Sequence, residues 1–286
     1  MANIELIKVL RERTGAGMMD CKHALEECAN DVDKACDWLR ERGIAKAAKK
    51  ADRIAAEGLT FVKVCDKCHK GVVVEVNCET DFVAKADPFK SLVEECAHNI
   101  LENNLQTLDE VKAQAEPLFA DATVKLGEKL SFRRFAVLEG ANLGSYIHMG
   151  GKISVLVSLK ENNPELAKGL AMHIAANNPK YISEKDIPED VVTNETKIQL
   201  ESCKNDPKLQ NKPEAALQNI VKGKVHKVLS EVTLLEQSYL LSPDKTVKDV
   251  LASEHNEVVA FYRYQVGEGL EKRVDNFAEE VMAQAK

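Results

Sequence analysis

The chain has 286 residues, of which 46 are acidic and 39 are basic, so its formal net charge is -7. An acidic chain is a poor match for the phosphate backbone of a nucleic acid, and no apolar run approaches the ~18 residues that a membrane span needs. Charged residues run through the first 17 positions, where a signal peptide would be apolar. We therefore expect a cytoplasmic protein that binds neither membrane nor nucleic acid and keeps its eight cysteines as thiols.

The first part of the chain predicts three short helices. Apolar residues recur at helical spacing, and the Gly15–Gly17 segment interrupts them because paired glycines favour turns. Asp31 is the expected N-cap of the third helix, and Gly43 its expected end. We predict a three-helix module over residues 1–45, followed by a helical linker over 46–57 that is rich in alanine and lysine.

A β-hairpin is expected after the linker. Residues 59–65 and 71–77 are rich in β-branched side chains and flank a Cys-Asp-Lys-Cys-His-Lys turn. Asp87 and Pro88 then predict a helix start, with the aspartate as N-cap and the proline in the first turn. A further helix and a third strand are predicted at residues 108–126 and 131–138.

The same order of elements recurs later in the chain. A second hairpin is predicted around Gly150 and Gly151, followed by a helix and, after a long interval, by a strand over 258–266. Aligning the hairpins and the helices leaves about six extra residues in the first copy, within residues 79–89. We therefore predict an α+β fold with two related core subdomains, over residues 58–140 and 141–266.

The second copy contains an insertion of its own, at about residues 184–235. Its apolar residues step by four or three, which is typical of a narrow coiled-coil seam. The predicted seam residues are Leu217, Val221, Val225, Val228 and Val232. A segment rich in proline and asparagine precedes them, so we predict an antiparallel helical hairpin that contacts another chain. The alternative is a helical pair that folds back on its own core.

A Cys-x-x-Cys-His sequence lies at the predicted first hairpin turn. Such a pair can bind zinc or cycle as a dithiol, but no second Cys-x-x-Cys supplies further ligands. The candidate ligands are Cys65, Cys68, His69 and Cys78. We interpret the motif as a plain turn and keep a zinc-stabilised or thiol-redox protein as the alternative function. No phosphate-binding loop, dinucleotide fingerprint or hydrolase motif occurs, so we expect neither an enzyme nor a cofactor.

The extra residues of the first copy hold the second candidate site. Thr80, Asp81, Phe82 and Val83 lie in a connection that the other copy lacks, so the shared fold cannot require them. An aromatic ring beside an acid at a loop tip is typical of an interface anchor. The alternative is that Phe82 folds back over its own helix.

Two stretches resemble the signature sequences of the bacterial elongation factor Ts family. They are RTGAGMMDCKHAL at residues 13–25 and EVNCETDFVAKADPF at 75–89, and YIHMGGKISVLV at 146–157 also stands in family order. The resemblance implies a guanine nucleotide exchange factor that releases GDP from elongation factor Tu. It also implies a ubiquitin-associated-like N-terminal module, a coiled-coil hairpin and a C-terminal module over 267–286.

The resemblance further assigns roles to individual residues. Thr80, Asp81, Phe82 and Val83 would enter the partner near its Mg²⁺ site and displace the ion. The residues expected to dock on the partner elsewhere are Arg11, Met18, Met19 and His148. The coiled coil would contact elongation factor Tu or a second copy of the chain, giving a homodimer or a heterotetramer. The Cys-x-x-Cys-His turn is not part of the resemblance.

Overall fold

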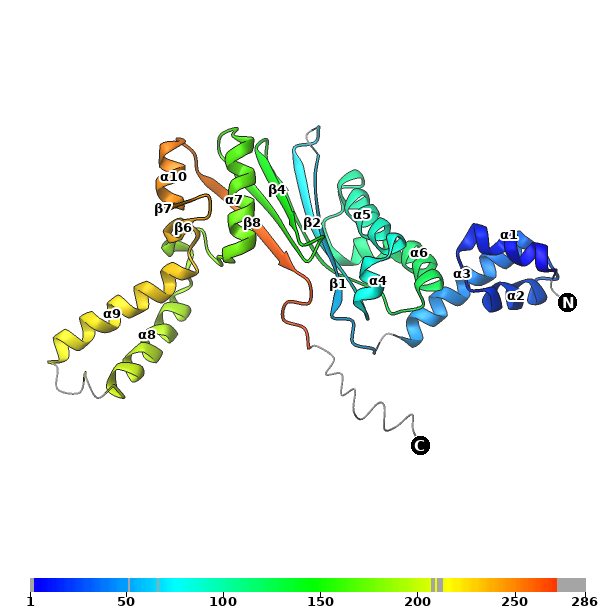
Figure 1. Cartoon of the computed structure of the whole chain (residues 1–286), viewed down its shortest axis with the longest axis horizontal. Coiled ribbons are helices and arrows are strands. Elements are labelled where there is room, and N and C mark those ends of the chain that lie inside the picture. Colours follow the sequence, from blue (N-terminus) through cyan, green and yellow to red (C-terminus); the bar gives the residue numbers. More distant parts are fainter. Residues whose placement is uncertain (1–2, 51, 66, 207–208, 210–212, 272–286) are drawn as a thin grey trace.

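The computed structural model describes residues 3–50, 52–65, 67–206, 209 and 213–271. Figure 1 shows an elongated molecule, with a helical module at one end, two small sheets in the middle and a helical hairpin at the other end. Helices and antiparallel sheets occur together, which confirms the predicted α+β class. None of the helices in the described part of the chain is long and apolar enough to cross a membrane.

The N-terminal module consists of α1 (Ile4–Thr14), α2 (Met18–Glu27) and α3 (Val32–Lys49). These helices bury a small apolar cluster that includes Leu10 and Leu25. Asp31 caps α3 as predicted, because its carboxylate accepts hydrogen bonds from the backbone N–H groups of the second and third residues after it, each at 3.1 Å. The three helices predicted for this part of the chain are all present.

The predicted end of the third helix at Gly43 is wrong. α3 continues to Lys49, so the segment predicted as a linker begins inside this helix. Gly43 is buried against α6 (Leu108–Leu126), and a Cβ atom at this position would lie 2.7 Å from the carbonyl oxygen of Ala120. The glycine therefore allows two helices to approach closely and does not end one of them.

The first sheet is antiparallel, with strand order β1-β2-β3. Its strands are β1 (Glu57–Cys65), β2 (Lys70–Cys78) and β3 (Ser131–Glu139). Alternate valines of β2 pack against α5 (Asp87–Glu102), whose apolar face includes Phe89 and Leu92. The N-cap of α5 is Ala86 and not Asp87 as predicted, because the extended backbone ends one residue earlier; Asp87 then lies in the first turn, where it pairs with Lys90 at 3.0 Å.

The second sheet repeats this arrangement, with strand order β4-β5-β8. Its strands are β4 (Leu143–His148), β5 (Ile153–Leu159) and β8 (Val258–Gln265). α7 (Pro164–Asn177) packs on its outer face. In both sheets a hairpin is followed by a helix and then by a strand that pairs with the second strand of the hairpin. The two sheets therefore share one order of elements, as the predicted duplication requires.

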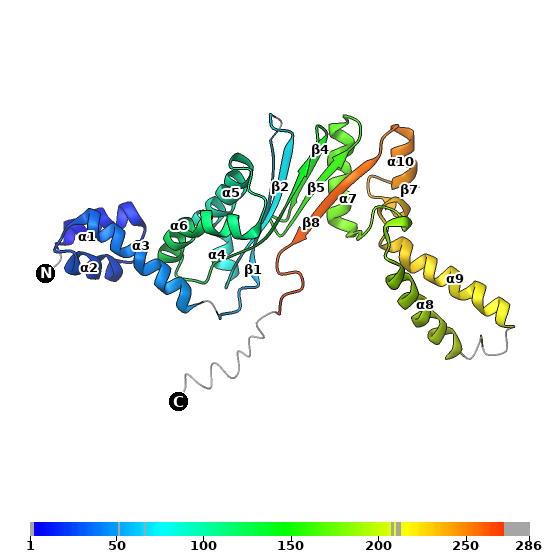
Figure 2. The same ribbon diagram turned by 180° about the vertical axis from the view of Figure 1, so that it is seen from behind.

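The two sheets face each other between their helices (Figures 1 and 2). An apolar cluster joins them, with Val62 and Val73 from the first sheet and Leu156 from the second. The backbone N–H of Thr60 donates to the carbonyl of Gly151 at 2.7 Å, and its hydroxyl lies 2.9 Å from that of Ser154. Apolar packing and hydrogen bonds together hold the sheets in one arrangement.

A buried carboxylate adds a third link between the sheets. Glu75 on β2 is completely buried and accepts hydrogen bonds from Arg133 Nη1 at 2.8 Å and Arg134 Nε at 2.6 Å. It also accepts from the backbone N–H of Gly267, just after β8, at 2.8 Å. This network attaches the end of the second sheet to the middle of the first.

The insertion forms an antiparallel pair, α8 (Glu189–Lys204) and α9 (Glu214–Glu231). Both views show it extending away from the sheets, so it does not fold back on the core (Figures 1 and 2). Val221 and Val225 are buried in its seam as predicted, but the next seam residue is Leu229, since the spacing of four continues, and Val228 is only half-buried. Most of the C-terminal module predicted for 267–286 lies outside the described residues.

Candidate partner-binding site

A short helix lies in the connection between β2 and α5. This helix, α4 (Asp81–Lys85), has no counterpart between β5 and α7, and it contains the predicted extra residues. Thr80 is its N-cap, with an extended backbone, and its hydroxyl accepts a hydrogen bond from the N–H of Val83 at 3.4 Å. The threonine hydroxyl thus accepts a hydrogen bond from one of the backbone N–H groups of the first turn, which have no partner within the helix, and this favours a helix start here.

The side chains of α4 divide between the core and the solvent. Ala84 is buried and Val83 packs against the core of the first sheet, whereas Phe82 is 81% exposed. The alternative that Phe82 folds back over its own helix is therefore wrong. An exposed phenylalanine on an anchored helix is an unpartnered apolar group, which is typical of a binding surface.

Asp81 carries a negative charge next to this ring. Lys85 Nζ lies 2.6 Å from its Oδ2, one helical turn away. This hydrogen bond is the main cause that lowers the pKa of Asp81, and the charges of Lys85 and Lys152 add to it. The carboxylate is therefore ionised at neutral pH and places a negative charge beside the exposed ring of Phe82.

The turn between β4 and β5 lies at the same end of the sheets as α4. Lys152, just after the turn, pairs with Glu57 at 2.7 Å, and Glu57 is the strand partner of Cys78 near α4. His148 ends β4, and its Nδ1 lies 3.2 Å from the hydroxyl of Tyr146. The structure therefore brings His148 and the α4 residues to one end of the core.

Met149 lies in the same turn and was not predicted as a contact residue. It has a left-handed backbone with φ of 49° and is 72% exposed. The following Gly151 has φ of 98°, and a Cβ there would lie 2.9 Å from the carbonyl oxygen of Thr60. The turn is thus fixed against β1 while Met149 projects. A bulky residue directly before two glycines in a hairpin turn was the available signal.

The other predicted contact residues lie on the N-terminal module. Met18 and Met19 form the first turn of α2, each with 60% of its surface exposed, and Arg11 is exposed on α1. These side chains point away from the buried cluster of the module, which contains Cys21 and Leu25. They form a second exposed surface, on a different body of the fold from α4.

Comparisons with known proteins agree on one family. A family model described as elongation factor TS matches residues 79–268, and its match begins one residue before Thr80. An elongation factor Ts from Acholeplasma laidlawii (strain PG-8A) is 47% identical over 289 residues, covering 98% of this chain and 97% of that protein. This chain belongs to the elongation factor Ts family.

The candidate zinc ligands of this family member do not form one site. Cys65 and Cys68 lie at the β1–β2 turn, whereas Cys78 is fully buried at the opposite end of β2, about 26 Å away at 3.3 Å per strand residue. Burial raises the pKa of Cys78 to about 12, so its thiol is inert. Among the described residues, no group of three or more His, Cys, Asp or Glu side chains is placed to hold a metal ion.

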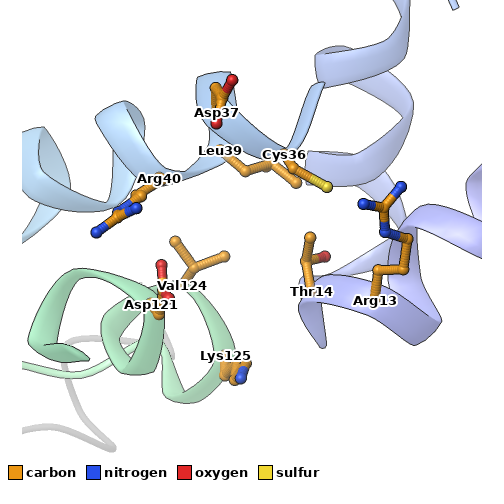
Figure 3. Close-up of a pocket in the computed structure, with 9 residues that line it drawn as sticks. All are labelled: Arg13, Thr14, Cys36, Asp37, Leu39, Arg40, Asp121, Val124 and Lys125. Atoms are coloured by element: carbon orange, nitrogen blue, oxygen red, sulfur yellow. The ribbon is translucent and has the colours of Figure 1, made fainter. Parts of the chain in front are cut away.

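A hollow of about 260 Å³ lies between the N-terminal module and α6, beside the contact of the two (Figure 3). Side chains of both charges line it, with Asp37 and Arg40 on α3 and Asp121 and Lys125 on α6. Val124 of α6 packs against the apolar cluster of the module beside this hollow. The module therefore rests on α6 through an apolar contact, and charged side chains surround the hollow beside it.

Proposed function

We propose that this chain releases GDP from elongation factor Tu by inserting α4, with Phe82 at its tip, beside the Mg²⁺ of the bound nucleotide. As a member of the elongation factor Ts family, the chain is a guanine nucleotide exchange factor for elongation factor Tu in translation elongation. The observation that carries the insertion mechanism is the 81% exposure of Phe82 on a helix that the sister subdomain lacks.

The physical effect follows from how a GTPase holds its nucleotide. Backbone and lysine contacts hold the phosphates, and Mg²⁺ bridges them to the protein. When the ring of Phe82 inserts between the partner's side chains, it shifts the elements that position the Mg²⁺ ion. The charged Asp81 then competes for the hydrogen bonds and the charge interactions around that ion. The residues that enter the partner are Thr80, Asp81, Phe82 and Val83. Loss of the ion then weakens the phosphate contacts and GDP leaves.

Exchange by this route needs no bond chemistry, so the chain acts as a binding protein and holds no cofactor. Coupling between two ligands is reciprocal: if the factor weakens GDP binding, bound nucleotide weakens the factor by the same ratio. GTP that rebinds therefore expels the factor and completes the cycle. The net acidic charge is consistent with a translation factor that contacts protein and no nucleic acid.

Two further surfaces complete the proposed complex. His148 and Met149 lie at the same end of the core as α4 and contact the partner together with it. The N-terminal module, ubiquitin-associated-like by resemblance and spanning residues 1–45, docks on the nucleotide-binding domain through Arg11, Met18 and Met19. The α8–α9 hairpin contacts elongation factor Tu or a second copy, which gives a heterotetramer or a homodimer. The chain works in the cytoplasm, where its partner is.

Replacing Phe82 by alanine tests the insertion. The variant should fold normally, because an exposed ring contributes little to the core, and should slow the release of fluorescent GDP from elongation factor Tu in stopped-flow measurements. Tyr262→Ala is the matched control, since Tyr262 is also an exposed aromatic, 40% accessible, but lies on β8. Release at the wild-type rate by the Phe82→Ala variant would overturn the proposal.

A further inference from the structure

The loop between α6 and β3 turns back toward the start of α4. Gly127 ends α6 in a left-handed conformation with φ of 72°, and Glu128 follows it with a half-buried side chain. Oε2 of Glu128 accepts hydrogen bonds from the backbone N–H groups of Glu79 at 3.0 Å and Thr80 at 2.9 Å. Oε1 accepts from the hydroxyl of Thr80 at 2.6 Å. One carboxylate thus binds three donors directly in front of α4.

The contact is reciprocal. Oε1 of Glu79 accepts a hydrogen bond from the backbone N–H of Lys129 at 2.7 Å, and the same carboxylate pairs with Arg53 at 3.3 Å. Four hydrogen bonds therefore join residues 79–80 to residues 128–129, and we call this set the Glu128 clamp. Each bond is accepted by a carboxylate oxygen, and hydrogen bonds to carboxylates are stronger than bonds between neutral groups.

We propose that Glu128 is a positioning residue for nucleotide exchange, which holds α4 in the orientation that presents Phe82 to the partner. The inference rests on the function proposed above. α4 has five residues, too few for a helix to be stable on its own, so its order depends on what holds its ends. At its start, the clamp holds the backbone of Thr80 and engages the hydroxyl that caps the N–H of Val83.

The clamp acts before the partner is met. A loop that is already ordered loses less conformational entropy on binding. If only a fraction of the molecules hold α4 correctly, the apparent affinity is the intrinsic affinity multiplied by that fraction, whereas the bound complex is unchanged. Glu128 therefore sets the concentration of factor needed for exchange and has little influence on the rate of GDP release at saturation.

Glu128→Ala removes all three acceptor contacts and is the main test. We expect the concentration of factor that gives half-maximal release of fluorescent GDP from elongation factor Tu to rise roughly tenfold, the factor that corresponds to one lost hydrogen bond to a charged group. The release rate at saturation should stay within about twofold of wild type. Glu116→Ala, an exposed glutamate on α6 far from the loop in sequence, is the matched control and should behave as wild type.

Two more variants separate positioning from general stability. Glu128→Gln keeps a carbonyl oxygen that can accept both backbone N–H groups, so it should restore most of the affinity. If Glu128→Ala does not fold, Glu79→Ala takes its place. This variant removes the reciprocal bond from the backbone N–H of Lys129 and the pair with Arg53, spares the residues that enter the partner, and should also raise the half-maximal concentration roughly tenfold. Circular dichroism at the assay temperature checks folding.

The double variant Phe82→Ala, Glu128→Ala gives the decisive result. If Glu128 acts by orienting α4, its removal should cost less when Phe82 is already absent, so the loss in the double variant should be smaller than the product of the two single losses. Independent, multiplicative losses would overturn the inference, and so would a Glu128→Ala curve that matches Glu116→Ala. Wild-type release by Phe82→Ala is a different failure, because it would overturn the proposed function itself.

Discussion

Removing the buried charge at Glu75 should weaken the junction between the two sheets. Its carboxylate is fully buried, and its partners Arg133 and Arg134 have only 21% and 30% of their side-chain surface exposed. Breaking such an ion pair by removing one member typically costs about 3–5 kcal/mol, because the remaining charges stay desolvated without a partner. For Glu75→Ala we therefore expect a loss of this order, or a fall in Tm of about 6–10 °C at roughly 2 °C per kcal/mol.

Thermal unfolding followed by circular dichroism measures this loss. Glu257→Gln is the control, because Glu257 pairs with Lys160 at 3.1 Å on the surface, where both side chains are more than half exposed. Exposed pairs of this kind contribute about 0–1 kcal/mol, so the control should unfold within about 2 °C of wild type. Equal shifts for the two variants would refute the argument that the buried network joins the sheets.

Two further predictions concern the second core subdomain. Burial lowers the pKa of His173 below its ordinary value of 6.5, although the hydrogen bond with Gln237 opposes the shift. The unfolded chain therefore binds an extra proton at acidic pH, and the free energy of unfolding should fall as the pH drops below 6.5. Denaturant unfolding from pH 7.5 to 5 should show a smaller fall for His173→Gln than for wild type, and an equal fall would contradict the prediction. Deleting residues 194–229 removes most of the α8–α9 hairpin and should change how the chain associates with other chains more than it changes the stability of the core. If light scattering gives the deletion variant the association state of wild type, both alone and with elongation factor Tu, the prediction is wrong.

The sequence predicted the elements whose cause is local. Strands and helices of the core follow from apolar periodicity and from turn residues, and the predicted helix over 108–126 matches α6 in both bounds. The site at Phe82 was found by comparing the two repeats, since a segment present in one copy only cannot serve the shared fold. The strands β6 (Ser238–Tyr239) and β7 (Ser242–Thr246) were missed, because two residues cannot show an alternating pattern and the five residues of β7 are polar apart from a proline.

The features that escaped prediction depend on residues distant in sequence. Glu128 is separated by 48 positions from Thr80, which it anchors, and Glu75 by 192 from Gly267. Nothing in the sequence near a surface glutamate distinguishes one that accepts three hydrogen bonds from one that is solvated. The prediction at Gly43 was wrong for a related reason. The sequence alone does not distinguish a glycine that permits close helix packing from a glycine that ends a helix.

The packing of the two repeats places the candidate site at one end of the core. The β4–β5 turn meets the start of β1 and the exit of β2, through the pair of Lys152 and Glu57. At the opposite end, the β1–β2 turn approaches the exit of β5 through the connection between β3 and β4. In this connection, the N–H of Gly140 donates to the carbonyl of His69, and the carbonyl of Asn142 accepts from the N–H of Leu159. Both ends thus combine a hairpin turn with a strand exit from the other repeat.

Only one of these two ends has an inserted helix. Residues 160–163 connect β5 to α7 directly, whereas the exit of β2 contains α4 with its exposed Phe82. A duplicated unit packed in this antiparallel way would present two similar ends to a partner. The insertion, with its threonine cap bonded to Glu128, makes one end different. Under the proposed function, this difference gives the factor a single direction of approach to its partner.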